Sequence, residues 1–244
     1  MRVFTAILTA LVLFGACSTT TERLEGYAVQ GIDVSHYQKL IDWKSVEADQ
    51  IDFAYIKATE GEIHQDTNFC KNWMDIKKTK ILRGAYHFFR PKLSALQQAN
   101  NFLFAIEKLE NGDLPPVLDI EVTDGASKEI VINRMKSWLE IIEIRLHQKP
   151  IIYTNLKFYY QFLIGNFEDY NIWISRYNDD APQLVAKQWT FWQYGRQGRV
   201  KGIEGDVDLN VFFGNNAQLD SLRFPSTFLS QTDPKLLHHS LSNP

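Results

Sequence analysis

The sequence predicts one α/β domain, an irregular TIM-like barrel, and two patterns support that prediction. First, about five strand-and-helix pairs follow one another along the chain, and further strands come after them with few helices between. Second, acidic, amide and aromatic residues recur late in the predicted strands or directly after them. Since the active sites of α/β barrels lie at the C-terminal ends of the strands, this second pattern predicts a functional site at one rim.

The periodicity of the apolar residues defines the elements in order. Alternating apolar and polar residues predict strands, and apolar residues three or four positions apart predict helices. The first half of the chain has predicted strands at residues 31–37, 52–59, 82–89 and 117–122, and predicted helices at residues 43–48, 69–78 and 94–109. The second half has predicted strands at residues 150–155, 171–175, 190–194 and 207–212, and predicted helices at residues 127–147 and 158–163. No repeat or low-complexity linker interrupts them, so one domain is expected over residues 29–214.

The strand at residues 117–122 carries two carboxylates. Side chains i and i+2 of a strand point the same way, so Asp119 and Glu121 should share one face, with their Cα atoms about 6.5 Å apart. Val117 shares that face, and the residues between them should pack against a covering layer. Such a pair suits acid chemistry. The alternative is a pair that is solvated at an exposed edge or bound to Arg or Lys.

Composition favours a carbohydrate site and argues against a nucleic-acid site. Six Trp and ten Tyr suit a groove in which aromatic rings stack on sugars. The formal net charge is -3 and the basic residues are scattered, whereas nucleic-acid binding needs clustered Lys and Arg. We therefore expect no nucleic-acid partner.

The N-terminus is typical of an exported protein. After a single basic residue, an apolar segment at residues 3–14 is too short to span a bilayer. Two small residues then precede Cys17, a pattern similar to the lipidation site of bacterial lipoprotein precursors, although Phe14 stands where Leu is usual. We expect a signal peptide at residues 1–17 and membrane contact only through a lipid on Cys17. The alternative is plain secretion after cleavage near Ser18.

Two further segments flank the domain. A short polar tether is expected at residues 18–28, and residues 215–244 form a tail rich in Ser, Asn, Pro and Leu. Cys70 then has no intrachain partner and is expected to be a small buried residue on a helix. The protein should act as a monomer in the cell envelope, anchored as a lipoprotein or else secreted.

Acidic residues from distant predicted strands gather near the predicted rim: Asp33, Glu60, Asp119, Glu121 and Asp208. A metal site would add His at close spacing or an acidic calcium loop, and the six His do not cluster in this way. The signatures of Ser nucleophiles, P-loops and dinucleotide sites are also absent from the sequence. No metal and no cofactor are therefore expected.

Acids beside abundant aromatic residues favour glycoside hydrolysis. One carboxylic acid protonates the leaving oxygen, and a second negative group stabilises the positive charge that forms. Asp119 and Glu121 suit these roles, because proximity raises one pKa and leaves the other group ionised, although spacing does not say which. Substrate contacts are expected from residues at strand ends, namely Tyr86, Tyr153, Trp192 and Gln193, with Trp173 a weaker candidate.

The motifs of the chain, taken in order, resemble those of the glycoside hydrolase family 25 muramidases. They are Gly31-Ile-Asp-Val-Ser, Tyr55-Ile-Lys-Ala-Thr-Glu-Gly61, Gly84-Ala-Tyr-His-Phe, Leu118-Asp-Ile-Glu121, Ile152-Tyr-Thr-Asn155, Trp192-Gln-Tyr194 and Val207-Asp-Leu-Asn210. Each motif is weak alone, but together they are specific and cover nearly all of residues 31–213.

This resemblance implies an eight-stranded barrel with few helices after the fifth strand. It also implies hydrolysis of the β-1,4 bond between N-acetylmuramic acid and N-acetylglucosamine in peptidoglycan. Glu121 matches the general acid, and Asp119 matches a carboxylate that stabilises a cyclic intermediate formed by the substrate's own N-acetyl group. The remaining matches are Asp33 and Asp208 as acids of the groove floor, and Glu60, Tyr86, Tyr153 and Trp192 as residues in or beside the groove.

Two other functions fit the same residues. One is a non-catalytic peptidoglycan-binding protein on the same scaffold, and the other is a barrel glycosidase acting on chitin-like polymers, in which an Asp-x-Glu strand also occurs. The intact acids argue against the first, since a binding protein has little use for a repelling pair. The expected partner is therefore the glycan strand of peptidoglycan.

Overall fold

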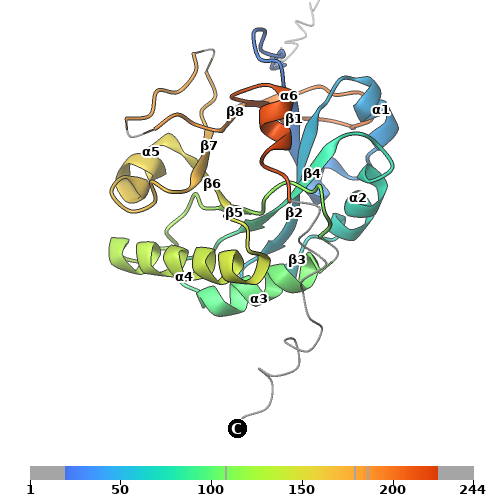
Figure 1. Ribbon diagram of the computed structural model, residues 1–244. Coiled ribbons are helices and arrows are strands. Elements are labelled where there is room, and N and C mark those ends of the chain that lie inside the picture. The colour runs from blue at the N-terminus through green and yellow to red at the C-terminus, as the bar shows by residue number, and fades with distance from the viewer. Residues whose placement is uncertain (1–19, 108, 179, 186, 225–244) are drawn as a thin grey trace, which may run out of the picture.

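The structure is a computed structural model that describes residues 20–107, 109–178, 180–185 and 187–224 (Figure 1). The predicted signal peptide at residues 1–17, including Cys17, lies outside the described residues, as does the tail beyond residue 224. Among the residues that are described, no helix is both long and apolar enough to cross a bilayer.

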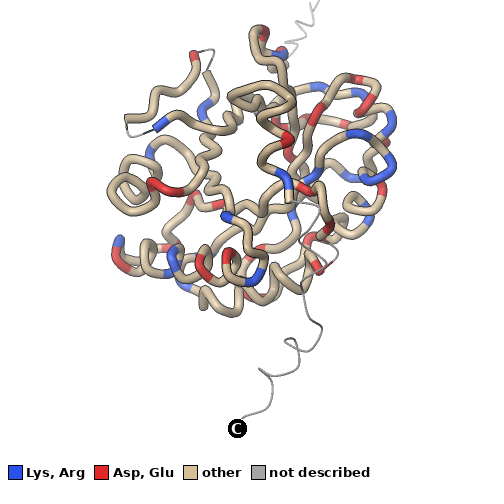
Figure 2. The backbone as a smooth tube through the Cα atoms, in the orientation of Figure 1, with Lys and Arg blue, Asp and Glu red and all other residues tan. Residues whose placement is uncertain are grey.

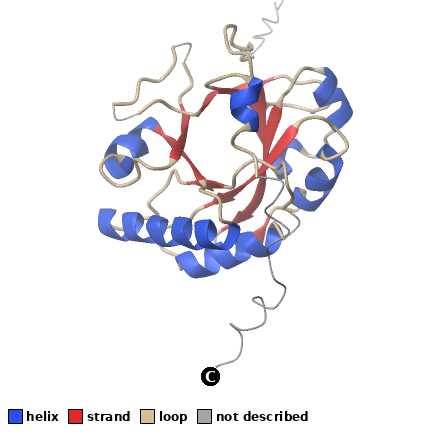
Figure 3. Ribbon diagram, in the orientation of Figure 1, coloured by secondary structure: helices blue, strands red, loops and turns tan. Residues whose placement is uncertain are grey.

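Eight strands close into a barrel, which confirms the predicted fold class (Figure 3). They are β1 (Gln30–Val34), β2 (Phe53–Glu60), β4 (Leu82–Phe88), β5 (Val117–Asp119), β6 (Ile151–Asn155), β7 (Asn171–Ser175), β8 (Phe191–Gly198) and β9 (Val207–Phe212). Each is hydrogen-bonded to the next, and β1 pairs with both β2 and β9, so the ring has no open edge. A two-residue strand that the sequence did not predict, β3 (His64–Gln65), pairs with the end of β2.

The last strand runs against the others. β9 is antiparallel to both β1 and β8, whereas the other neighbours in the ring are parallel. Asp208 is the second residue of β9, and it pairs with Asp33 near the end of β1. The reversal therefore places the start of β9 at the rim where the parallel strands end.

Helices cover the outside of the barrel. They are α1 (Trp43–Ala48), α2 (Phe69–Ile76), α3 (Ala95–Ala105), α4 (Lys128–Leu146) and α5 (Leu156–Phe158), which continues into a π-helical turn at Tyr159–Leu163. Figure 1 shows α3 and α4 side by side along one flank, and they contact each other. The short helix α6 (Asn216–Asp220) lies at the opposite end from the rim described above, beside the first residues of β1 and β4. Few helices follow β6, as predicted.

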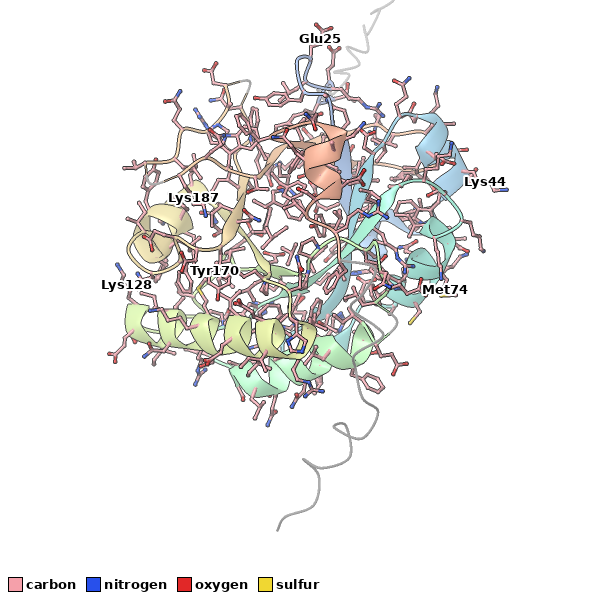
Figure 4. The ribbon with its side chains drawn as sticks, in the orientation of Figure 1. Glu25, Lys44, Met74, Lys128, Tyr170 and Lys187 are labelled. Atoms are coloured by element: carbon pink, nitrogen blue, oxygen red, sulfur yellow. The ribbon has the colours of Figure 1, made fainter. Side chains whose placement is uncertain are left out.

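Two apolar layers fix the strands. The outer layer packs strand residues against the helices, with Trp138 of α4 fully buried. The inner layer fills the barrel and includes Phe53, Tyr55 and Trp173, so the ring of strands is packed with side chains (Figure 4). Glycines make room for these rings: a Cβ at Gly31 would lie 2.2 Å from the Phe53 ring.

Two details differ from the sequence-based expectations. The strand predicted at residues 117–122 ends at Asp119, so Glu121 lies just beyond it. Cys70 was expected to be buried, and that expectation is wrong, because α2 presents its thiol to solvent. Figure 2 shows Lys and Arg interspersed with Asp and Glu around the barrel, in agreement with the scattered charge of the sequence.

Candidate active site

A pocket of about 250 Å³ opens at the rim where the parallel strands end and β9 begins. It contains all four acids predicted as catalytic, namely Asp33, Asp119, Glu121 and Asp208, together with Tyr86, Tyr153 and Gln193. Further lining residues include Tyr37, Lys57, Trp173 and Tyr177. Residues far apart in the sequence therefore meet in one cavity.

Asp33 lies at the floor of the pocket and accepts two amide hydrogen bonds on one oxygen. Gln193 Nε2 donates to Asp33 Oδ2 at 2.8 Å, and Asn210 Nδ2 donates to the same atom at 2.7 Å. Burial raises the pKa of Asp33, and these two hydrogen bonds act in the opposite direction. The two amide donors thus favour the ionised form of Asp33.

The orientations of the two amides follow from their other partners. Tyr153 and Tyr177 both donate their hydroxyls to Gln193 Oε1, at 2.8 Å and 2.9 Å. The indole N–H of Trp173 can only donate, and it bonds Asn210 Oδ1 at 2.9 Å. Each amide oxygen is therefore occupied, so each amide nitrogen must face Asp33.

Of the neighbouring carboxyl groups of Asp33 and Asp208, that of Asp208 carries the proton. Burial, together with the negative charges of Asp33 and Glu121, raises the pKa of Asp208 to about 8. A hydrogen bond joins Asp208 to Asp33, whose pKa it lowers. Near neutral pH, the pair thus carries one proton, on Asp208, and one negative charge, on Asp33.

This arrangement predicts how stability depends on pH. A carboxyl group whose pKa is higher in the folded state stabilises the protein when protonated, and that contribution is lost as pH rises through the folded pKa. Asp208→Asn removes the charge and keeps a donor toward Asp33, so it should raise Tm at about pH 9 and change it little at about pH 5. Each kcal/mol gained corresponds to about 2–4 °C in Tm.

Thermal unfolding at both pH values checks this result. Asp206→Asn is the matched control, because Asp206 is exposed and pairs with Arg199 on the surface. An equal Tm shift for Asp208→Asn at both pH values would contradict the assignment of the proton to Asp208.

Asp119 and Glu121 face the same cavity, as the two-residue spacing predicts. The chain stays extended past the end of β5, because the N–H of Ile120 donates to Tyr153 O at 3.0 Å. Leu118 and Ile120 point outward into the apolar layer beneath the helices. The alternative of a solvated pair is wrong for Asp119, which is only 6% exposed.

Both carboxyl groups hold protons more tightly than usual. Burial, and then the charge of Glu121, raises the pKa of Asp119 well above its ordinary value, while the charge of Lys57 lowers it. Burial and the charge of Asp33 raise the pKa of Glu121, and a hydrogen bond with Asn155 lowers it. Asp119 Oδ1 is buried without a hydrogen-bond partner among the described residues. The site thus offers a protonated acid and an unused acceptor side by side.

Trp192 does not line the pocket, so the prediction that it contacts substrate there is wrong. It is fully buried on the outer side of β8, where its ring contacts Trp189 and its Nε1 donates to Arg176 O at 2.8 Å. Neighbouring residues of a strand face opposite sides, so Gln193 inside the barrel requires Trp192 outside. Trp173 occupies the inward position on β7 instead.

Glu60 lies outside the set of residues that line the pocket, so its predicted contact with substrate stays a prediction. Its carboxylate is held in two ion pairs, with Lys57 at 2.7 Å and with Arg90 at 2.5 Å. Lys57 itself does line the pocket, so Glu60 is ion-paired with a residue of the site.

Sequence reasoning missed several residues of the site. Asn210 lies two positions after Asp208 on the same face of β9, and this spacing was the signal that could have revealed it. Tyr177 follows β7 closely, as an aromatic residue directly after a strand end. Tyr37 lies on a one-turn 3-10 helix (His36–Gln38) that a capping box from Ser35 holds in place.

Buried carboxyl groups facing aromatic side chains at a barrel rim define a site of the glycoside hydrolase type. Comparisons with known proteins agree. The family model described as "Glycosyl hydrolases family 25" matches residues 32–203. The chain therefore belongs to glycosyl hydrolase family 25, and it is a glycoside hydrolase.

Named relatives and solved structures support this membership. The chain is 41% identical to YegX of Escherichia coli over 198 residues, which cover 79% of this chain and 72% of the relative. It is 36% identical to lysozyme M1 of Streptomyces globisporus over 209 residues, which cover 80% of this chain and 71% of the relative. The structure of a family 25 glycosyl hydrolase from Bacillus anthracis matches with a TM-score of 0.77 and 32% identity, covering 85% of this chain and 99% of that one.

Proposed function

We propose that this glycoside hydrolase is a muramidase that cleaves the β-1,4 bond between N-acetylmuramic acid and N-acetylglucosamine in peptidoglycan. Relatives named lysozyme and N,O-diacetylmuramidase, together with family membership, support hydrolysis of peptidoglycan. The observation that carries the proposal is the pair of Asp119 and Glu121 in one cavity. The raised pKa of Glu121 favours its protonated form, and Asp119 has an acceptor oxygen, Oδ1, without a hydrogen-bond partner among the described residues.

Glu121 is the proton donor in this proposal. It is less buried than Asp119, and its raised pKa keeps the proton in place until substrate binds. Transfer of that proton to the glycosidic oxygen lets the bond from this oxygen to C1 break, and the leaving sugar departs as an alcohol. The Glu121 carboxylate that remains later takes a proton from the water that attacks C1, and this attack breaks the bond between C1 and the acetamido oxygen of the cyclic intermediate.

Asp119 stabilises the positive charge that develops at the sugar. Its unpartnered Oδ1 can accept the N–H of the substrate's 2-acetamido group, whose oxygen then attacks C1 to form a cyclic intermediate. This N–H would give Oδ1 a hydrogen bond that no described residue of the protein supplies, and hydrogen bonds to a carboxylate favour its ionised form. Asp33 and Asp208 lie below as a singly charged pair that favours positive charge above the floor.

Release of reducing ends tests the proposal. Purified peptidoglycan and chitin oligomers are incubated with the protein, and new reducing ends are measured over time. Release from peptidoglycan, with little or none from chitin, is expected. Preferential release from chitin would favour a chitin-type glycosidase, and tight glycan binding without any release would favour a non-catalytic binding protein.

We also propose that the protein is exported and anchored to a membrane by a lipid on Cys17. The described part of the tether is bound to the barrel, so a lipid on Cys17 would hold the barrel close to the membrane. Thr21 N donates to Gln197 O at 3.0 Å, and Arg23 forms an ion pair with Asp49 at 2.6 Å. Glu25 marks the loop that follows in Figure 4.

Metabolic labelling with a fatty acid tests this anchoring. Label should enter the parent protein and be lost in Cys17→Ala. Cys70→Ala is the matched control, because Cys70 is an exposed free thiol far from the N-terminus in sequence, and this variant should label normally. Absence of label in the parent would reject the anchor and favour plain secretion.

A further inference from the structure

Lys57 is the one basic side chain among the described residues that line the pocket. It comes from β2 and faces a cavity that holds four carboxyl groups. The roles proposed above use the four acids and leave this cation without a function. A positive charge has an evident cost here, since the reaction itself develops positive charge on the sugar.

A β-bulge brings Glu60 to the same side as Lys57. In a regular strand, residues three apart face opposite sides. The pairs between β2 and β4 are Lys57–Tyr86, Thr59–His87 and Glu60–Phe88, with a shift between Lys57 and Thr59. One residue, Ala58, is therefore extra, and it turns Glu60 back to the inner face. Bulges of this kind re-aim side chains beside active sites.

The bulge produces a fixed row of alternating charges. Lys57 Nζ lies 2.7 Å from Glu60 Oε2, and Arg90 binds the other oxygen of Glu60 at 2.5 Å. Arg90 also reaches Asp124, at 3.2 Å, in the turn that follows Glu121. Both cations also lie over the ring of Phe88, with Lys57 Nζ 5.1 Å and the Arg90 guanidinium carbon 4.8 Å from the ring centroid.

Each ion pair in this row restricts the motion of the side chains that form it. The ion pair with Glu60 keeps the Lys57 ammonium at the side of the pocket, away from the bond that is cleaved. Arg90 shares the charge of Glu60, so Glu60 does not fully neutralise Lys57. The result is a cation at a fixed place beside the carboxyl groups.

We propose that Lys57 is a positioning residue for Asp119: its fixed ammonium keeps Asp119 ionised when substrate binds. This inference rests on the proposed function, in which Asp119 must be an anion. The neighbouring charges show the need for such a cation. Glu121, Asp33 and Glu60 all raise the pKa of Asp119, as burial does, and Lys57 is the group that lowers it. The hydroxyls of Tyr86 and Tyr153, which also face Asp119, stay neutral because their pKa values are raised.

The pH dependence of kcat on soluble peptidoglycan fragments tests this inference, because kcat reports the pKa values of groups in the enzyme–substrate complex. Activity rises with pH as Asp119 loses its proton, so the acidic limb of the profile follows its pKa. Lys57→Met and Lys57→Gln should move this limb to higher pH by about one unit, since the positive charge of Lys57 lowers the pKa of Asp119 and its loss raises it. Activity should recover at higher pH until Glu121 is deprotonated. Lys57→Arg, which keeps the charge, should restore the parent profile.

Two features keep the experiment decisive. Glu60 retains its ion pair with Arg90 in every variant, and Gln at position 57 can still donate to Glu60, so the fold should persist. Lys71→Met is the control, because Lys71 is an exposed lysine paired with Asp75 on α2.

An unshifted limb with activity reduced equally at all pH values would show a structural role and overturn the inference. A higher KM with an unshifted limb would overturn it in favour of direct substrate contact. A parent protein that releases no reducing ends would instead remove the proposed function, a result distinct from an active enzyme whose limb does not move.

Discussion

Glu121→Gln should retain the fold and lose nearly all hydrolysis of peptidoglycan. The amide has the shape of the acid but cannot give a proton to the glycosidic oxygen, and general acid–base catalysis contributes about 10²–10⁴-fold to rate. We expect kcat to fall by this factor while KM changes little, because the amide can still contact the sugar. Release of reducing ends from purified peptidoglycan measures both constants.

Two comparisons make this result specific. Glu129→Gln changes an exposed glutamate in the first turn of α4 and should leave kcat unchanged. Thermal unfolding should show that Glu121→Gln is at least as stable as the parent, since burial raises the pKa of Glu121 and its charged form is therefore costly. Normal turnover by Glu121→Gln would refute its role as the acid.

Asp119→Asn should lower kcat by a factor similar to that of Glu121→Gln, for a different reason. It removes the negative charge beside the sugar and, with it, the acceptor that orients the acetamido N–H. Electrostatic groups of this kind each contribute about 10²–10³-fold to kcat. The measurement compares parent and variant on glycan with and without the N-acetyl group of the sugar that carries C1.

The two changes act on one interaction, so their effects should not multiply. Loss of the acetyl group should slow the parent enzyme strongly and slow Asp119→Asn little further. Asp220→Asn, on the exposed helix α6, serves as the control and should behave as the parent does. Losses that multiply would mean that Asp119 acts independently of the N-acetyl group.

Local patterns made most of the fold predictable. Strand alternation and helical periodicity identified every strand of the barrel, because each strand has a buried outer face. The direction of β9 was not predictable in this way, since alternation reads the same in both directions. Its antiparallel pairing depends on the long-range register of Asp33 with Asp208.

The candidate site was predictable where spacing alone decides the geometry. Asp119 and Glu121 share a face because they are two residues apart, and the same rule shows that Trp192 and Gln193 cannot both face inward. The inward orientation of Glu60 was not predictable from the sequence, because it depends on a bulge at Ala58 that reverses the alternation at the end of β2.

Mass analysis of the released ends shows directly which glycosidic bond the protein cleaves. Purified peptidoglycan is digested with the parent protein, the products are reduced with borohydride, and the reduced sugars are identified. Cleavage by a muramidase leaves N-acetylmuramic acid at every new reducing end, and reduction converts it to its alditol. We predict reduced N-acetylmuramic acid from the parent and about 10²–10⁴-fold less of it from Glu121→Gln in the same time; reduced N-acetylglucosamine at the new ends would contradict muramidase activity.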